Sequence, residues 1–395
     1  MSGLKKGYHG SSCACACGGS ARFVNWRNKT LLSLFGELRL AGSYYHCAAC
    51  HTSQQPWDKT LRLGKHRVTP AAEEAITLSG LLTSFGRASR QTLRKLTGIV
   101  VSESTVERVT EDAGKQLSEC LARKQIIGPT KPWKWQRDAR GQTCGYVSLD
   151  YVSVPQQGPG GAKADSRMAA VALVYNPPSG HDEPLPRGND EVRYLSGFYQ
   201  LNELGSQLRR QAAQVGWDDL EQQLAISDAG NGLEDFQRKN FARAERILDF
   251  FHASEHMGRL AQALHPRDVD ETKRQTGQWC HTLKHAGGVA LRQQWEQLDP
   301  RGWAADSQET HRQELQYFRN HEHKMDYPRY VTNGWQIGSG PVESACKRVV
   351  TQRLKGAGMR WSERGSNAVC HLQALLLSQT DCWDQFWSTS GHLRN

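Results

Sequence analysis

The spacing of apolar side chains changes within the first third of the chain. Residues 1–66 begin with glycines and cysteines and then alternate as strands do, whereas residues 67–124 carry apolar positions three and four apart, which predicts helices. Gly98 is placed to end one of these helices, and Ser102 or Ser104 to cap the next. A helix, a glycine turn and a capped helix outline a helix-turn-helix, although a plain helical hairpin fits the same pattern.

A second series of elements follows residues 125–143, a segment of prolines, glycines and basic residues that is typical of a linker. Three stretches rich in β-branched and aromatic residues predict strands, and an amphipathic helix and a short apolar strand at residues 224–228 come after them. Residues 257–330 are polar and helical in pattern. Three strands, a helix and a fourth strand fit a mixed sheet with helices on its faces, so the predicted fold class is α/β.

The composition narrows the choice of partners. The chain has 395 residues, enough for two or three domains, and a formal net charge of +10, which favours a polyanionic partner such as nucleic acid. No stretch approaches the roughly 20 apolar residues of a membrane-spanning helix, and the first residues lack the apolar run of a secretion signal. We therefore expect a cytoplasmic protein without a membrane role, whose 11 cysteines are metal ligands or free thiols rather than disulfides.

Two cysteine knuckles about 30 residues apart indicate a zinc-ribbon-like module in residues 1–66. The candidate ligands are Cys13, Cys15, Cys17, Cys47, Cys50 and, more weakly, His51. The second knuckle is a clean C-x-x-C, and the glycines that follow Cys17 favour Cys15 and Cys17 in the first, with Cys13 as the alternative. A structural Zn²⁺ held by four thiolates would replace the hydrophobic core that so small a module lacks.

Two aspartates stand out in the predicted sheet. Asp150 lies inside a strand of β-branched and aromatic residues, where a carboxylate is disfavoured unless it is paired, protonated or bound to a metal. The alternative is an edge strand on which Asp150 faces water. Asp228 ends a strand, where carboxylates face the ligand crevice of open α/β sheets, although it could equally start an Asx turn.

A third carboxylate, Glu343, begins a basic segment near the C-terminus. Pro341 suits the first turn of a helix, which would make Gly340 the cap and Glu343 the third helical residue, where the helix dipole favours an acid. A helix-start role is therefore sufficient to explain it. Together with Asp150 and Asp228, however, it completes a set of hard oxygen ligands suited to Mg²⁺ or Mn²⁺, and a metal pair can clamp the oxygens of a phosphoryl displacement.

Cations follow Glu343 along the same segment and are candidate DNA contacts. They are Lys347, Arg348, Arg353, Lys355 and Arg360, with Trp361 directly after them. Lysine and arginine bind phosphates, and a tryptophan can stack on unpaired bases. A second basic stretch with tryptophans, "KPWKWQR", could contact DNA or could be a linker with buried anchors.

Six stretches together carry a family resemblance. They are "YVSLDYVSV", "AISDAGNGLEDF", "RILDFFHASEH", "YFRNHEHKMDYPRY", "QIGSGPVESACKRVVTQRLKGAGMRW" and "CWDQFW". In these stretches the chain resembles the DDE transposases of bacterial insertion sequences, in particular the ISKra group, which is related to the Mutator-like transposases. The resemblance implies a ribonuclease H-like core formed by residues 144–256 and 331–395, with a helical insertion at residues 257–330 and the zinc-ribbon-like and helix-turn-helix-like regions in front.

The resemblance also implies roles for single residues. Asp150, Asp228 and Glu343 would be the catalytic triad and would hold magnesium. Mutator-like relatives carry an Asp-x-x-His element after the second acid, and Asp249 and His252 match it. We therefore expect His252 near the catalytic site, contacting DNA or orienting a carboxylate. The alternative is a structural histidine whose hydrogen bonds are satisfied within the fold.

The function implied by the resemblance is metal-dependent strand cleavage and 3′-OH strand transfer. The partners would be the terminal inverted repeats of an element and its target DNA, bound by a homo-oligomer at the bacterial nucleoid. The first alternative is a non-catalytic, zinc-containing DNA-binding protein derived from a transposase. A more distant alternative is a zinc peptidase, because His252, Glu255 and His256 form an H-x-x-E-H pattern that such enzymes place on a helix.

Overall fold

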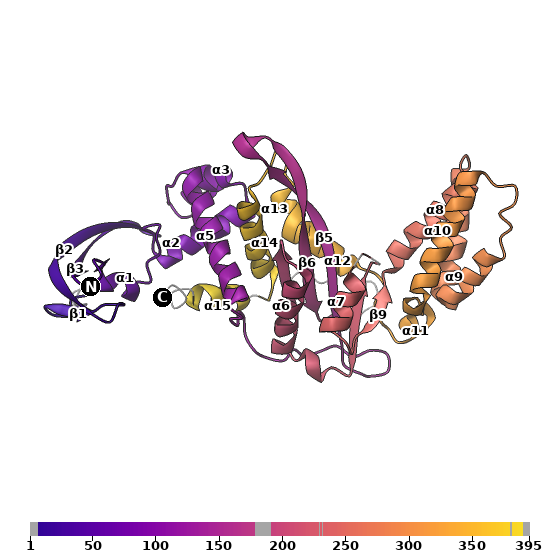
Figure 1. The fold of residues 1–395 in the computed structure, drawn as a ribbon, viewed down its shortest axis with the longest axis horizontal. Coiled ribbons are helices and arrows are strands. Elements are labelled where there is room, and N and C mark those ends of the chain that lie inside the picture. Colours follow the sequence, from indigo (N-terminus) through magenta and orange to yellow (C-terminus); the bar gives the residue numbers. More distant parts are fainter. Residues whose placement is uncertain (1–6, 178–190, 229, 231, 380, 390–395) are drawn as a thin grey trace. The chain divides into compact units, whose positions relative to one another are not determined.

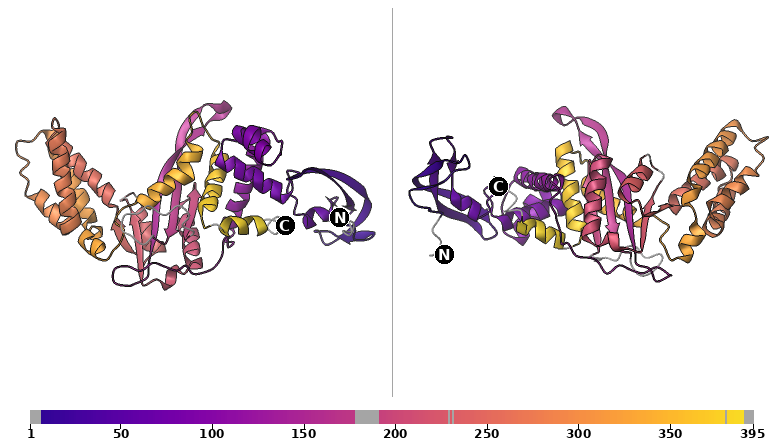
Figure 2. Two further views of the ribbon diagram at one scale, coloured as in Figure 1. Left: turned by 180° about the vertical axis from the view of Figure 1, so that it is seen from behind. Right: turned by 60° about the horizontal axis from the view of Figure 1, so that its bottom comes forward.

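Two units, each with its own sheet, divide the chain in this computed structural model (Figures 1 and 2). The first comprises Met1–Gly128, Ser362–Gln373 and Asp381–Asn395, and the second Pro129–Trp361 and Ala374–Thr380. The structure describes all residues except 1–6, 178–190, 229, 231, 380 and 390–395. None of the helices in the described part combines the length and apolar content needed to cross a bilayer.

The first unit begins with an antiparallel sheet. Its strands, in spatial as well as chain order, are β1 (Ser12–Ala14), β2 (Ser20–Ser33), β3 (Gly36–Cys47) and β4 (Ser53–Gln54). The long β2–β3 hairpin closes at Gly36, whose φ of 96° favours glycine and whose carbonyl accepts the Ser33 hydroxyl at 2.8 Å. A short helix α1 (Pro56–Thr60) follows the sheet.

Helices complete the first unit. They are α2 (Pro70–Leu82), α3 (Phe85–Arg87), a π-helical segment (Ala88–Leu93), α4 (Arg94–Leu96) and α5 (Glu103–Ala122). Gly98 has a φ of 74° just after α4, and the Ser102 hydroxyl accepts the Thr105 N–H at the start of α5, so both predicted boundaries are confirmed. Gly114 of α5 lets Ala368 approach, because an added Cβ would lie 2.5 Å from its carbonyl oxygen. Tertiary contacts, more than local helix propensity, therefore fix this packing.

The second unit contains a mixed sheet, as the sequence predicts, with a fifth strand at Glu245–Leu248 that was not predicted. Its strands are β5 (Cys144–Gln157), β6 (Lys163–Tyr175), β7 (Val192–Gly197), β8 (Gln222–Ser227) and β9 (Glu245–Leu248). Their spatial order is β7-β6-β5-β8-β9; β7, β6 and β5 are antiparallel, and β8 and β9 run parallel to β5. Nearly every residue of β7 and β8 is buried, as expected of strands covered on both faces.

The helices of the second unit follow the strands. They are α6 (Leu201–Gln214), α7 (Leu233–Asn240), α8 (Phe250–Leu264), α9 (Val269–Glu296), α10 (Ala305–His321), α11 (Tyr327–Thr332), α12 (Gly340–Ala345), a π-helical segment (Cys346–Thr351) and α13 (Gln352–Leu354). The remaining helices are α14 (Glu363–Leu377), which has residues in both units, and α15 (Asp381–Thr389), in the first. Helices α8, α9 and α10 pack on one another, with Trp295 against Phe318 in their core.

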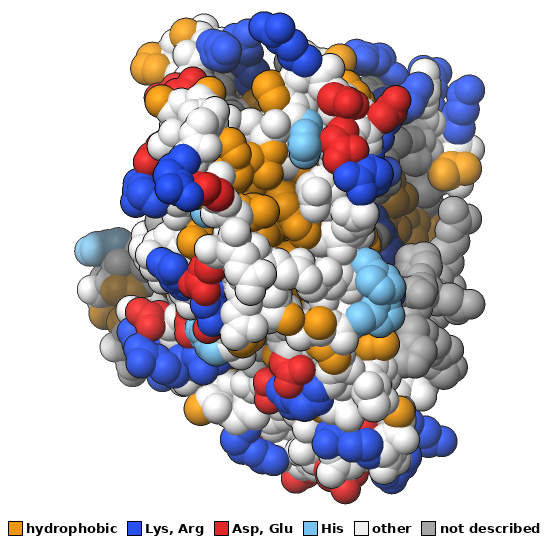
Figure 3. All heavy atoms as spheres, turned by 90° about the vertical axis from the view of Figure 1, so that its right-hand side faces the viewer, with side chains coloured by type: hydrophobic (Ala, Val, Ile, Leu, Met, Phe, Trp, Pro, Cys, Tyr) orange, Lys and Arg blue, Asp and Glu red, His pale blue; other side chains and the backbone are white. Residues whose placement is uncertain are grey.

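The surface of α8–α10 is mixed in charge. Figure 3 shows acidic side chains interspersed with lysines and arginines on this face. Ion pairs form along and between α9 and α10, such as Arg319 with Glu296 and Arg312 with Glu309. An area of hydrophobic side chains is visible between the charged ones. Because like charges are not gathered here, this face is a poorer candidate for a DNA backbone than a purely basic one.

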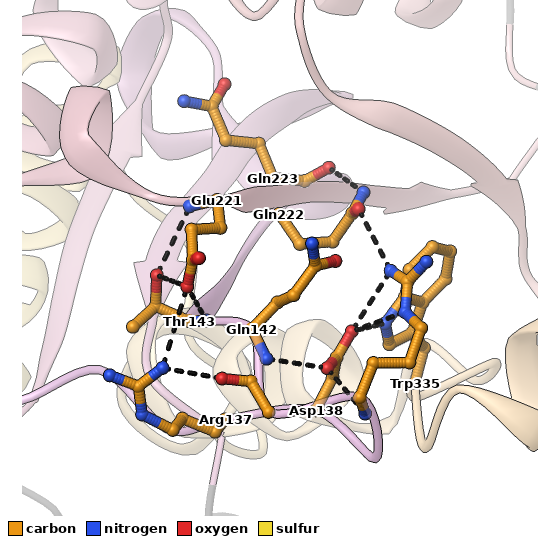
Figure 4. A network of polar contacts seen from close by, with 10 residues as sticks. Arg137, Asp138, Gln142, Thr143, Glu221, Gln222, Gln223 and Trp335 are labelled. Carbon is orange, nitrogen blue, oxygen red and sulfur yellow. Dashed lines mark hydrogen bonds and ion pairs between the residues drawn. The ribbon is translucent and has the colours of Figure 1, made fainter.

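The segment expected to be a linker is anchored to the second unit from Pro129 onward. Trp133 is buried, and the Trp135 indole donates to the Val215 carbonyl at 3.1 Å. The Asp138 carboxylate, drawn in Figure 4, accepts from the Trp335 indole. It also accepts from the Arg140 guanidinium. Of the two possibilities for "KPWKWQR", the structure favours buried anchors, because its tryptophans are engaged within the fold.

Candidate functional site

Four cysteines of the first unit converge on one point. The sulfurs of Cys15, Cys17, Cys47 and Cys50 all lie within 4.8 Å of one another. Cys15 and Cys50 are 3.6 Å apart, and Cys17 and Cys47 are 3.8 Å apart. A tetrahedral site with Zn–S bonds of 2.3 Å has sulfur–sulfur edges of about 3.8 Å. The cluster therefore has the ligand type and dimensions to bind a structural metal such as zinc.

The knuckle turns explain which cysteines take part. In the first turn the Cys15 N–H donates to the Gly19 carbonyl at 2.9 Å, which folds Cys15 and Cys17 toward one side. Cys13 is outside the cluster, and its sulfur accepts the Gln54 amide at 3.1 Å. The choice between Cys13 and Cys15 is thus settled for Cys15. The backbone N–H of Cys17, followed by neighbouring side chains, lowers the pKa of Cys15 to about 6, which favours the thiolate that metals bind.

An acidic pocket of about 130 Å³ lies in the second unit. It is lined by Leu149, Asp150, Asp228, Asp249, Phe251, His252, Glu255, Ser339, Val342 and Glu343. The predicted triad and His252 therefore share one pocket, although they come from four separate parts of the chain. We call it the acidic pocket below.

The sheet register brings the two aspartates to the same level. Strands β5 and β8 pair up to Ser148 opposite Ile226; Asp150 lies two residues further along β5, and Asp228 directly follows the last residue of β8. Strand β5 has neighbours on both sides, so the edge-strand alternative for Asp150 is wrong. The Asx-turn alternative for Asp228 is correct in itself, since its Oδ1 accepts the Gly230 N–H at 2.9 Å, and the turn coexists with its place in the pocket.

The surroundings of Asp150 disfavour the charged form of its carboxyl group. Burial raises its pKa above the usual range, donors from Tyr151 and Cys346 oppose this, and the nearby charges of Asp228 and Glu343 raise it further. The Tyr151 N–H lies 2.6 Å from Oδ1 and the Cys346 sulfur 3.5 Å from Oδ2. A divalent cation would remove this repulsion, so the donor set fits a hard metal such as Mg²⁺ or Mn²⁺.

Glu343 lies in α12, but the start of that helix differs from the prediction. The cap is Ser339 rather than Gly340, so Glu343 is one position further into the helix. The Ser339 hydroxyl does not cap α12 and instead lies 2.7 Å from Glu343 Oε1. The Glu343 side chain is exposed, which leaves it accessible to a ligand entering the pocket.

His252 lies in the first turn of α8, whose N-cap is Asp249. Its neighbour His256 is bonded through Nδ1 to Glu314 at 2.5 Å and stacks on Tyr317. Glu255 is largely exposed. Among the residues that the structure describes, these side chains form no metal-binding group, so the geometry gives no support to the peptidase alternative.

The predicted DNA contacts fall into two classes. Lys347, Arg348, Lys355 and Arg360 are exposed. Arg353 and Trp361 are buried, with the guanidinium 4.8 Å from the indole ring and the indole N–H donating to the Leu354 carbonyl. Burial lowers the pKa of Arg353 to about 10. Because their side chains pack within the fold, the structure gives no support to DNA contact by Arg353 and Trp361.

Two residues at the acidic pocket were not predicted from the sequence. Ser339 contacts Asp249 and Glu343, and Cys346 contacts Asp150. A serine before Gly-Pro at a helix start is a weak signal of a cap, and a cysteine in a helix has no signal of its own. Asp249 was expected only as the partner of His252 in a short element.

A scan of protein-family models finds no match to this chain, and no curated protein matches it.

Proposed function

We propose that this chain is a DNA transposase that cuts and joins DNA strands with the help of divalent metal ions. The observation that carries the proposal is the meeting of Asp150, Asp228 and Glu343 in one pocket, on a central strand, at the end of its parallel neighbour and on a C-terminal helix. Three convergent carboxylates suit phosphoryl transfer by metal catalysis better than any other reaction of polyanionic substrates. The resemblance to ISKra-group DDE transposases names the same residues.

The topology supports the proposal. An antiparallel β-meander followed by two strands parallel to its first is the arrangement expected of a ribonuclease H-like core. Helices α8–α10 stand between the second and third acids, where the resemblance expects an insertion.

Different side chains would have different roles in the reaction. Asp150, Asp228 and Glu343 would hold the metal, which when bound activates the attacking oxygen and stabilises the leaving one. Lys347 and Arg348, exposed in the turn after Glu343, would hold the DNA backbone beside the pocket. His252, on the pocket wall, would contact the strand to be cut or orient a carboxylate.

The test is cleavage of a supercoiled plasmid that carries the repeats flanking the gene, in the presence of Mg²⁺ or Mn²⁺. We expect nicking and strand joining at the repeat ends, both lost in Asp228→Asn. Asp235→Asn is the matched control, because this exposed acid of α7 pairs with Arg238 outside the pocket. Full activity of Asp228→Asn would refute the catalytic assignment.

The same experiment separates the second candidate function. A non-catalytic DNA-binding protein would retard the repeat DNA in a gel and leave every strand intact. The exposed cations and the cysteine cluster are compatible with either function, so strand cleavage is the deciding observation.

A further inference from the structure

Asp249 is a buried carboxylate whose oxygens are fully engaged. It is 4% exposed, and its Oδ1 accepts the N–H groups of Phe251 at 3.2 Å and Ser339 at 2.9 Å. Its Oδ2 accepts the His252 N–H at 3.1 Å and the Ser339 hydroxyl at 2.9 Å. A carboxylate offers about four lone-pair sites; on Asp249 three of them accept backbone N–H groups and the fourth faces the Ser339 hydroxyl, which makes Asp249 a poor metal ligand. It acts as a junction between chain segments.

The segments joined at Asp249 are those that carry two of the pocket acids. Its own N–H donates to the carbonyl of Ser227, the residue directly before Asp228, at 2.9 Å. Through Ser339 it is connected to Glu343, because the Ser339 hydroxyl is 2.7 Å from Glu343 Oε1. One buried residue thus relates the position of the second acid to that of the third.

Ser339 is held in place on both sides. Its hydroxyl has one hydrogen and two carboxylate acceptors, so it donates to Asp249 or to Glu343 and can turn from one to the other. The preceding Gly338 brings the segment close to α8, since an added Cβ would lie 2.7 Å from the Phe251 ring. Ser339 is only 7% exposed, so water competes poorly for these bonds.

We propose that Ser339 is a positioning residue that, anchored by Asp249, fixes the Glu343 carboxylate for binding a divalent cation together with Asp150 and Asp228. The inference rests on the proposed function, in which Glu343 is a metal ligand. Hydrogen bonds to a ligating carboxylate orient it and are worth about 10- to 100-fold in metal affinity. With its hydrogen on Glu343 Oε1, the hydroxyl leaves Oε2 for the cation, and Asp249 keeps the three backbone N–H donors of Phe251, His252 and Ser339.

The test is a titration of the full chain with Mn²⁺, in which the electron paramagnetic resonance signal of free Mn²⁺ measures how much is bound. We expect Ser339→Ala to weaken the pocket site about 10-fold and Ser339→Thr, which keeps the hydroxyl, to stay within about threefold of wild type. Ser254→Ala is the control, because this serine of α8 donates to the Phe251 carbonyl and does not line the pocket. It should bind Mn²⁺ as wild type does.

The outcomes separate this inference from the function on which it rests. Wild-type affinity in Ser339→Ala, or equal weakening in Ser339→Ala and Ser339→Thr, would refute the hydroxyl's role while leaving the function intact. A wild-type Mn²⁺ site that survives Asp228→Asn would overturn both. Asp249→Asn provides a second route, since it loses one acceptor for Ser339 and should weaken Mn²⁺ binding in the same direction.

Discussion

The Cys346 sulfur lies 3.5 Å from Oδ2 of Asp150, so a buried thiol faces a partly buried carboxylate at the acidic pocket. Burial raises the pKa of both groups. The thiol therefore stays protonated and donates a hydrogen bond to the carboxylate, which favours the ionised form of Asp150. An acid that is costly to ionise and yet provided with a donor is typical of a site built to receive a cation.

Asp150 should reduce stability in the metal-free chain. Its pKa is raised in the folded state, so the folded chain binds this proton more tightly than the unfolded chain, and stability falls as pH rises through the raised pKa. We expect Asp150→Asn to increase the melting temperature of the metal-free protein at pH 8, by less at pH 5, and to abolish Mn²⁺ binding. Asp165→Asn, at an exposed position of β6, should change neither. A lower melting temperature for Asp150→Asn at pH 8 would contradict the argument.

The cysteine cluster should bind one zinc ion per chain. Zinc measured by inductively coupled plasma mass spectrometry should be lost in Cys17→Ser and retained in Cys13→Ser, because only Cys17 belongs to the cluster. The β1–β4 sheet has a small buried core, so metal loss should also unfold it and expose it to proteolysis. Zinc loss in Cys13→Ser equal to that in Cys17→Ser would show that the cluster is assigned wrongly.

Arg348 and Arg353 should behave differently when each is replaced by alanine. Arg348 is exposed, so its loss should weaken DNA binding and reduce the slope of log K against log salt by about 1. Arg353 is buried over Trp361, so its loss should cost about 2 kcal/mol of unfolding free energy and leave the salt slope nearly unchanged. Filter binding over a range of salt, with urea unfolding, measures both. If both variants reduced the slope of log K against log salt by the same amount, the burial of Arg353 would be contradicted.

His371 should make the first unit sensitive to acid. It is buried in α14, and burial lowers its pKa to about 4, so the folded chain excludes a proton that the unfolded chain binds below about pH 6.5. Stability should therefore fall between pH 6.5 and 4, with about 2 kcal/mol lost by pH 5. Urea unfolding at pH 7 and pH 5 measures this loss. In His371→Gln the decrease in unfolding free energy between the two pH values should be smaller than in the wild type by about 2 kcal/mol. An unchanged pH dependence would indicate that another group is responsible.

The sequence predicts those features that depend on residues close together in the chain. Gly98 and Ser102 were identified from helix-end chemistry, and the cysteine knuckles from their spacing. Asp150 and Asp228 were identified because a carboxylate in an apolar strand or at a strand end is unusual. In each case the residue and its reason lie within a few positions of one another.

The remaining features depend on distant parts of the chain. Asp249 and Ser339 are 90 residues apart, and no local pattern pairs them. The π-helical segment Cys346–Thr351 adds a residue to a helical turn, which rotates the following side chains by about 100°. No local pattern predicts this insertion, and Arg353, which follows it, is buried.

The N–H of Phe250, the first residue of α8, donates to the carbonyl of Ile337, two residues before Ser339, at 2.9 Å. The same ends of the intervening segment are joined by the hydrogen bonds from Ser339 to Asp249, and the entropy of closing a loop grows only slowly with its length. The segment can thus gain or lose whole helices at small thermodynamic cost while its two ends stay together. The positions of Asp249 and Ser339 are then independent of its length, so a chain with a different insertion can keep the same pocket.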